Sequence, residues 1–169
     1  MAHAIRIFRE NGLERQRLEE ERARDRATRD LLARLTNRLQ GCDTLDDLAQ
    51  VVVRFVPDLL PVAGGRLYLL DKSRGVLTEL CCWLNPEGST DEFPPLSCWA
   101  LRRGSSHRLA GTQRDVPCGH LGDRMVADAL CLPLIVQREA VGLLYLEPHG
   151  DISAFDASVE VYLPMLTEN

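Results

Sequence analysis

Two cysteines and two histidines gather in one part of the sequence that shows few signs of regular structure. Cys98, His107, Cys118 and His120 all fall within residues 85–128, a span of more than forty residues. Loops of that length inside a compact domain usually carry function. Thiolates are redox-active, and both thiolate and imidazole groups are metal ligands, so these four side chains are the first candidates for chemistry.

Three interpretations of these side chains stay open. In the favoured one, the cysteines are small buried hydrophobic residues. In the second, Cys98 and Cys118 form a redox pair that passes through a disulfide or a sulfenic acid. In the third, Cys98, Cys118 and His120 bind a metal or haem. The spacing from Cys118 to His120 is too short for a zinc finger and there is no CxxC pair, so no metal site is predicted; Cys131, flanked by leucines, is assigned to the core.

A tryptophan and two arginines follow the first of these cysteines. Trp99, Arg102 and Arg103 share one side of a short predicted helix, because residues three and four apart are neighbours on a helix. One interpretation is an anion or nucleotide clamp built on the arginine forks. In the alternative, which we favour, Trp99 packs into the core and the arginines cap the helix or pair with Asp115 or Asp123.

The elements that must position these residues are a helix and two pairs of strands. Apolar residues recur at helical spacing from Leu45 to Leu59, behind a capping box of Thr44 and Asp47; Pro57 is expected to bend or shorten this helix and Pro61 to close it. Strands are predicted at residues 65–70, 75–84, 129–137 and 141–147, with a turn at 138–140, a short edge strand near Leu109 and a last helix from Ala154. This order predicts an α+β fold in which helices flank an antiparallel sheet.

The N-terminal segment, residues 1–40, has a different composition. Between Arg9 and Asp30 it holds seven acidic and seven basic residues, with no proline. Leu18, Leu32 and Leu39 keep a seven-residue register that Asp25 interrupts. Such a helix is too polar to stay folded alone, so a parallel two-stranded coiled coil with a weak polar middle is expected, and with it a homodimer. A solvated helix or a disordered tail is the alternative.

Composition excludes several classes of protein. The formal net charge is −5 and hydrophobic residues make up 45% of the chain, which argues against a non-specific nucleic-acid binder and against wholesale disorder. No apolar run is long enough to span a bilayer, so we expect no membrane contact from this chain. The six cysteines are irregularly spaced, which favours a reducing cytoplasm over a disulfide framework.

Three runs of the predicted strands resemble a known family. The sequences Arg-Leu-Tyr-Leu-Leu-Asp at 66–71, Leu-Pro-Leu-Ile-Val at 132–136 and Val-Gly-Leu-Leu-Tyr-Leu at 141–146 look like parts of a GAF domain, and the resemblance covers residues 28–169. The segment Cys-Trp-Ala-Leu-Arg-Arg-Gly at 98–104, with His107 and the later Cys118-Gly119-His120, resembles GAF domains found ahead of GGDEF diguanylate cyclase domains. Residues 1–11 resemble the end of a HAMP linker, which connects a transmembrane sensor to cytoplasmic outputs.

These resemblances imply a domain organisation and a function. Residues 1–40 would be a signalling helix and residues 41–169 a GAF/PAS-like domain, in the cytoplasmic part of an inner-membrane protein. The domain would relay a signal to a C-terminal output domain and would not be an enzyme itself. The favoured output domain is a diguanylate cyclase, and the alternative is a sensor kinase. A small-molecule ligand would lie between the sheet and the irregular segments, with its identity left open; its candidate binding residues are Cys98, Trp99, Arg102, Arg103, His107, Cys118 and His120.

Two further functions remain open under the same resemblance. One is an enzyme that resembles free-methionine-sulfoxide reductase and uses Cys98 and Cys118. The other is a GAF domain that has lost its ligand and serves only in dimerisation, in which case side chains would fill the pocket. Attachment of a bilin is not expected, because Gly119 separates Cys118 from His120, whereas the chromophore cysteine of bilin-binding GAF domains is followed directly by histidine.

Overall fold

The chain divides into two compact units, residues 1–42 and residues 43–169. The computed structural model describes residues 2–61, 63–111, 116–122, 126–150 and 154–155, with side chains from Gly12 onward. The predicted helix from Ala154 therefore lies outside the described residues, as do Asp115 and Asp123. No helix among those described is hydrophobic over a length that would cross a bilayer.

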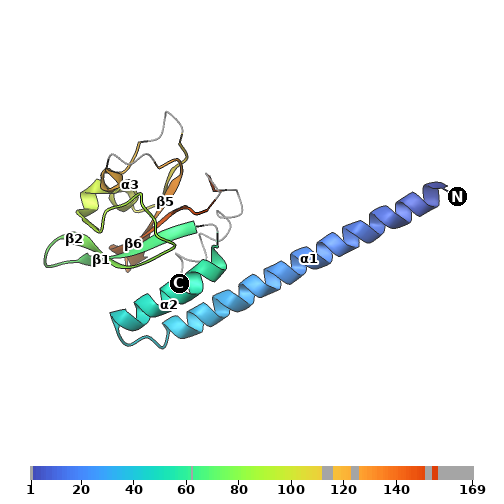
Figure 1. The fold of residues 1–169 in the computed structure, drawn as a ribbon. Helices are drawn as coiled ribbons and strands as arrows, with labels where there is room; N and C mark the ends of the chain where they lie inside the picture. Colours follow the sequence, from blue (N-terminus) through green and yellow to red (C-terminus); the bar gives the residue numbers. More distant parts are fainter. Residues whose placement is uncertain (1, 62, 112–115, 123–125, 151–153, 156–169) are drawn as a thin grey trace. The chain divides into compact units, whose positions relative to one another are not determined.

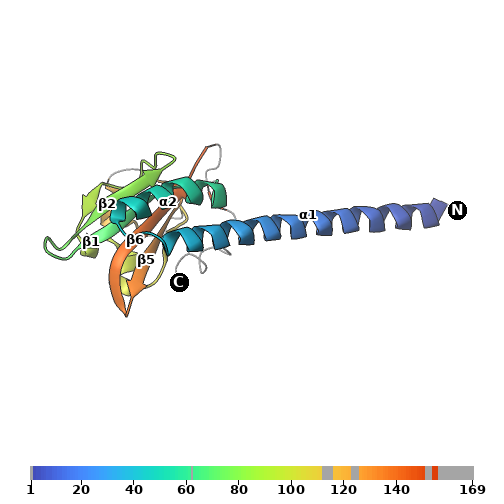
Figure 2. The same ribbon diagram turned by 90° about the horizontal axis from the view of Figure 1, so that it is seen from below.

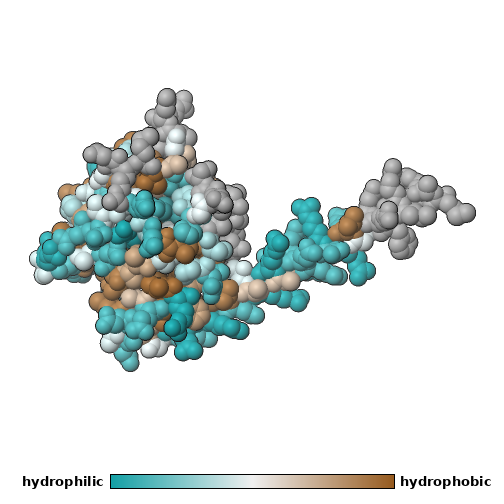
Figure 3. Space-filling model, viewed as in Figure 1, coloured by the Kyte–Doolittle hydropathy of each residue, from teal (hydrophilic) through white to brown (hydrophobic). Residues whose placement is uncertain are grey.

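The first unit is a single helix, α1, which runs over Ala2–Leu39. This confirms the long N-terminal helix predicted from the charge pattern. From Gly12 onward its surface is mostly hydrophilic (Figure 3). Exceptions are Leu13 and Leu18, whose exposed fractions are 68% and 47%. Ion pairs four residues apart join Arg15 to Glu19 and Arg17 to Glu21, and exposed pairs of this kind stabilise a helix only slightly.

The second unit begins with helix α2, Leu45–Leu59. The predicted capping box is present: the Thr44 hydroxyl accepts from the Asp47 amide, and the Asp47 carboxylate accepts from the Thr44 amide. The helix continues through Pro57 and ends at Leu59, so Pro57 does not shorten it. The ring removes one hydrogen bond close to the C-terminal end, and burial of Val52 and Val56 on one face of the helix outweighs that loss.

Antiparallel strands follow, and within the described residues they form a six-stranded sheet in the order β3-β2-β1-β6-β5-β4. The strands are β1 (Ala63–Asp71), β2 (Val76–Trp83), β3 (Glu92–Phe93), β4 (His107–Leu109), β5 (Ala129–Val136) and β6 (Glu139–Pro148). All four predicted central strands and the short edge strand are present. The second hairpin turns at Gln137 and Arg138 rather than at 138–140, with φ angles of 51° and 69° at these two residues.

The sheet separates two layers. Helix α2 lies along one face and the short helix α3 (Trp99–Arg103) lies on the other (Figures 1 and 2). Residues paired across strands point to the same face, so register assigns them to layers. Leu67, Leu144 and Leu132 pair in a row on the α2 face, whereas Tyr145 and Cys131 pair on the opposite face.

The opposite face is covered by the long connections that the sequence marked as irregular. Two short 3-10 helices, η1 (Pro95–Ser97) and η2 (Gly119–Leu121), lie in these connections together with α3. The hydrophobic core on this side comprises Tyr68, Leu77, Phe93, Cys98, Ala100, Cys118, Leu121, Ala129, Cys131, Leu143 and Tyr145. Three of the cysteines thus meet in the layer between the sheet and the connections.

Candidate functional site

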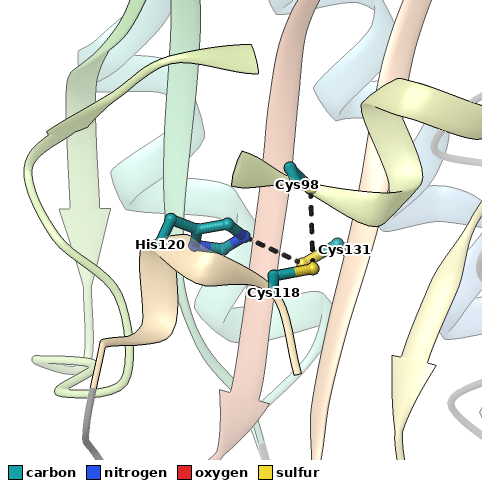
Figure 4. Close-up of side chains that lie close together, drawn as sticks. All are labelled: Cys98, Cys118, His120 and Cys131. Atoms are coloured by element: carbon teal, nitrogen blue, oxygen red, sulfur yellow. Dashed lines mark hydrogen bonds between the residues drawn. The ribbon is translucent and has the colours of Figure 1, made fainter. Parts of the chain in front are cut away.

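Three separate segments bring cysteine and histidine side chains to one point on this face. Cys98 lies between η1 and α3 in extended conformation, and its amide donates to the Pro95 carbonyl oxygen. Cys118 directly precedes η2, and His120 lies within it. Cys131 lies on β5 and points to the face of the sheet opposite α2. The four side chains point toward one another (Figure 4).

The donor atoms of this cluster are close together. The sulfur atoms of Cys98 and Cys118 are 3.9 Å apart, and Cys131 Sγ is 3.6 Å from His120 Nε2. All four donor atoms lie within 4.8 Å of one another. None of the four side chains exposes more than 2% of its surface. We refer to Cys98, Cys118, His120 and Cys131 as the Cys3His cluster.

The electrostatics of the cluster favour one thiolate. Hydrogen bonds with Cys131 and with Cys98 lower the pKa of Cys118 far below its ordinary value, and the Trp99 amide also donates to its sulfur, at 3.3 Å. The same contacts act in the opposite direction on the partners. The hydrogen bond between Cys98 and Cys118 raises the pKa of Cys98 to about 11. The hydrogen bond between Cys131 and Cys118 likewise raises the pKa of Cys131. Cys118 is thus the most acidic of the three thiols.

The His120 ring is held by contacts on its other side. Its Nδ1 lies 2.8 Å from Ser89 Oγ, which is in turn 2.8 Å from the Tyr68 hydroxyl. The Phe93 ring stacks on the imidazole, with centroids 4.3 Å apart. Burial raises the pKa of Tyr68, so the phenol keeps its proton. The imidazole is therefore fixed in position, with Nε2 directed at the thiols.

The loop that carries Ser89 is tied to the sheet by a carboxylate and a guanidinium. Glu147 on β6 accepts from the amides of Glu87, at 2.6 Å, and Gly88, at 2.8 Å. Arg66 on β1 donates to Asp91, at 2.6 Å, and to the Pro86 carbonyl oxygen, at 2.9 Å. These contacts hold both ends of the loop, and thereby place the Ser89 hydroxyl against His120.

Comparison with known proteins places this fold. Residues 44–162 match the GAF domain family. The chain belongs to the GAF family. No protein with a curated description matches the chain. Among solved structures, the GAF domain of the Acinetobacter phosphoenolpyruvate-protein phosphotransferase is 20% identical, with a TM-score of 0.60 over 83% of this chain and 88% of that one.

Two other solved structures bear on the alternatives. Free methionine-R-sulfoxide reductase from Neisseria meningitidis, in complex with its substrate, is 15% identical with a TM-score of 0.61, over 83% of this chain and 82% of that one. The phycocyanobilin-bound GAF domain of a cyanobacterial phytochrome is 16% identical with a TM-score of 0.63, over 83% and 90%. At these identities, the likeness extends to the fold alone.

The remaining candidates of this GAF domain lie around the cluster rather than in it. His107 is on β4, and its Nε2 contacts the Val116 carbonyl oxygen at 3.0 Å. Trp99 is half-buried and packs against the hydrophobic core on this face of the sheet. Arg102 lies over the Trp99 ring, 4.0 Å from its centroid, and Arg103 is exposed on the last turn of α3. The two arginines thus do not join the cysteines and histidine.

Sequence reasoning placed Cys131 in the core and overlooked its partners. The thiol is buried, as predicted, but it also faces the other two cysteines. The available signal was strand alternation: Cys131 lies opposite Tyr145 and two residues from Ala129, on the face that points away from α2. No motif marked Ser89, which becomes a neighbour of His120 only through the fold of its loop.

Proposed function

We propose that this chain is a regulatory sensory module, in which a GAF domain biases the arrangement of a parallel pair of N-terminal helices and so controls an output domain. The observation that carries this proposal is the direct succession of a 38-residue charged helix and a GAF domain. The GAF fold supplies a layer of buried polar and thiol groups beneath long connections, where a ligand or chemical change can act.

The composition of α1 supports association through this helix. A long isolated helix with so few apolar residues gains little from burial, and most helices in proteins depend on packing of one face. Leu18 is exposed, and Asp25 interrupts the seven-residue register it begins. A seam that is polar around Arg22, Asp25 and Arg29 would keep two helix arrangements close in free energy, which a switch requires.

The finer part of the proposal rests on the sequence resemblances. The residues that resemble a HAMP end lead us to propose a membrane-bound sensor upstream, with this module on the cytoplasmic side of an inner membrane. The residues that resemble GAF domains ahead of GGDEF domains lead us to propose a diguanylate cyclase as the output, acting as a homodimer. The module itself would contribute no catalytic group.

Sedimentation equilibrium of the full chain tests the helical dimer. We expect a concentration-dependent dimer that Leu18→Asp weakens by at least about tenfold in dissociation constant, equivalent to about 1.4 kcal/mol. Asp25→Leu should strengthen it, because the substitution completes the apolar register. Leu96→Asp is the matched control: this leucine, 79% exposed, lies in the second unit. A monomer at high concentration, or equal effects of the two Leu→Asp changes, would overturn the proposal.

The output assignment has its own experiment. In a protein that joins this chain to the proposed output domain, we expect conversion of GTP to cyclic di-GMP, altered in rate by Asp25→Leu. Failure to form the product would overturn the diguanylate cyclase assignment and leave the dimer result standing.

One distance favours a second candidate function. Cys98 Sγ and Cys118 Sγ are 3.9 Å apart, close enough for a small movement to join them. In a reductase, two thiols would form a disulfide while a sulfoxide substrate becomes a thioether and its oxygen leaves as water. Against this, both thiols are almost fully buried. Turnover of free methionine sulfoxide with loss of two titratable thiols would favour the enzyme; absence of both would exclude it.

A further inference from the structure

We propose that Cys98, Cys118, His120 and Cys131 bind one zinc ion in a closed tetrahedral site. The proposal does not depend on the signalling function above. It also departs from the expectation of no metal site, which was drawn from the spacing of Cys118 and His120 and did not include Cys131. The inference rests on the distances, on the histidine's hydrogen bonds and on the donor set.

The separations between donor atoms fit tetrahedral zinc. With zinc bonds of about 2.3 Å to sulfur and about 2.0–2.1 Å to nitrogen, tetrahedral angles put two sulfur ligands about 3.8 Å apart and sulfur and nitrogen about 3.5 Å apart. The corresponding distances are 3.9 Å between Cys98 and Cys118 and 3.6 Å between Cys131 and His120. Two of the separations therefore match a zinc coordination sphere, and because all four donor atoms lie within 4.8 Å of one another, a small contraction of the side chains would complete it.

Hydrogen bonds assign the lone pair of His120 to the metal side. The Tyr68 hydroxyl lies 2.7 Å from the Thr90 carbonyl oxygen, which can only accept, so the Tyr68 proton is used there. The Ser89 hydroxyl can then donate to the Tyr68 oxygen and accept from His120 Nδ1–H. In this tautomer of the neutral ring the lone pair lies on Nε2, which faces the thiols (Figure 4). Zinc-bound histidines are held in this way, through the ring nitrogen that does not bind the metal.

The chemistry of the donor set selects the metal. Three sulfur atoms and one imidazole nitrogen form a soft set that suits zinc and not calcium or magnesium, which take oxygen ligands. Four buried protein ligands leave no open position for a substrate, so the site would be structural rather than hydrolytic. When zinc binds, the cysteine ligands give up their thiol protons to solvent, and three thiolates with one Zn²⁺ carry a net charge of −1.

The positions of the ligands indicate what the metal would stabilise. Cys98 is the N-cap residue of α3, Cys118 is the N-cap residue of η2, and His120 lies within η2. Cys131 lies on β5, an interior strand of the sheet. The segments that carry the first three have little regular structure of their own. A metal that joins them to β5 would fix the connections over the sheet, and zinc binding would contribute to the folding of this layer.

Metal analysis and cobalt substitution test the proposal on the full chain. We expect one zinc per chain after purification, and replacement by Co²⁺ should give the visible bands of tetrahedral cobalt with thiolate charge transfer. Cys131→Ser should lower zinc affinity about 100-fold or more. Cys81→Ser is the matched control, since Cys81 is a buried cysteine of β2 outside the cluster. It should retain the metal.

A ligand exchange keeps the test decisive if Cys131→Ser fails to fold. His120→Cys supplies a fourth thiolate, so this variant should still bind one Co²⁺ with a spectrum shifted toward that of four sulfur ligands. Absence of stoichiometric zinc or cobalt in the wild-type chain would overturn the proposal, as would iron in place of zinc. Equal loss of metal in Cys81→Ser, or a Cys98–Cys118 disulfide in freshly purified protein, would also overturn it.

Discussion

Ser89 Oγ lies 2.8 Å from His120 Nδ1, although 31 residues separate them in the chain. The serine comes from the loop between β2 and β3, and the histidine from η2. This contact holds the imidazole from the side opposite the thiols, and its effect can be measured apart from that of the thiols themselves.

Removal of this hydroxyl should weaken metal binding without removing a ligand. We expect Ser89→Ala to lower zinc affinity by about 10–100-fold, because the ring loses the hydrogen bond that fixes its tautomer and orientation. Competition with a chromophoric zinc chelator measures the change. Thr90→Ala is the control, since its hydroxyl contacts the Glu92 carbonyl oxygen and not the imidazole. Equal affinities for Ser89→Ala and wild type would contradict the proposed role.

The buried carboxylate of Asp128 should be important for stability. It is 1% exposed and accepts from Arg108 Nη2, at 2.9 Å, and from the Phe155 amide, at 2.8 Å. We expect Asp128→Asn to lower the free energy of unfolding by about 2–3 kcal/mol, less than for a fully buried pair because Arg108 is partly exposed. Urea denaturation measures the change.

An exposed ion pair provides the comparison for Asp128. Lys72 and Glu139 are 3.0 Å apart, and both are 71% exposed. Glu139→Gln should change stability by less than about 1 kcal/mol. If both carboxylates gave the same change, burial of Asp128 would not be the cause of its effect.

The absence of a side chain at Gly65 is required by the packing of Trp83. A Cβ at this position would lie 2.2 Å from the Trp83 ring and 2.7 Å from the Tyr145 carbonyl oxygen. We expect Gly65→Ala to destabilise the domain by about 1–3 kcal/mol, because ring and strand must both shift. Thermal unfolding followed by circular dichroism measures the effect. Gly12→Ala, which meets nothing within 4 Å on α1, should be neutral or slightly stabilising.

The two hairpin turns each contain a residue with a positive φ, so a glycine should be favourable at both positions. Arg138 adopts a φ of 69° in the β5–β6 turn, a conformation that costs a non-glycine residue about 1–2 kcal/mol. Arg138→Gly should therefore raise the free energy of unfolding by up to about 1 kcal/mol, after the added entropy of the unfolded chain is subtracted. Gly75 has a φ of 68° in the β1–β2 turn, so Gly75→Ala should lower stability by a similar amount. Chemical denaturation of both variants checks the pair, and a stabilising Gly75→Ala would contradict the explanation.

Local sequence patterns predicted the elements that depend on local interactions. The capping box of Thr44 and Asp47 is a contact between residues three apart, and strand alternation follows from side-chain direction alone. The turn at Gln137 and Arg138 was placed one residue late, because neither residue carries the glycine or asparagine signal of such turns.

The Cys3His cluster depends on contacts that no local pattern records. Cys98 and Cys131 are 33 residues apart in the sequence, and they meet because β5 pairs with β6 while η1 and η2 fold over the same face. A spacing rule for zinc sites presumes that two ligands share one short turn. Here only Cys118 and His120 are close in sequence, and their spacing does not fit the rule, so the sequence predicted no zinc site. The tertiary fold supplied the remaining two ligands.

The two tryptophans lie on opposite sides of the sheet, which gives the domain two separate optical reporters. Trp83 is 4% exposed and donates to the Ala63 carbonyl oxygen on the α2 side. On the other side, the Trp99 amide donates to Cys118 Sγ, and the Trp99 side chain packs against the core that contains the thiols. Trp83→Phe leaves an emitter that responds to events at the thiols, and Trp99→Phe leaves one that responds to the helix-covered layer. Emission from the two variants can therefore show whether the two layers loosen together or one after the other.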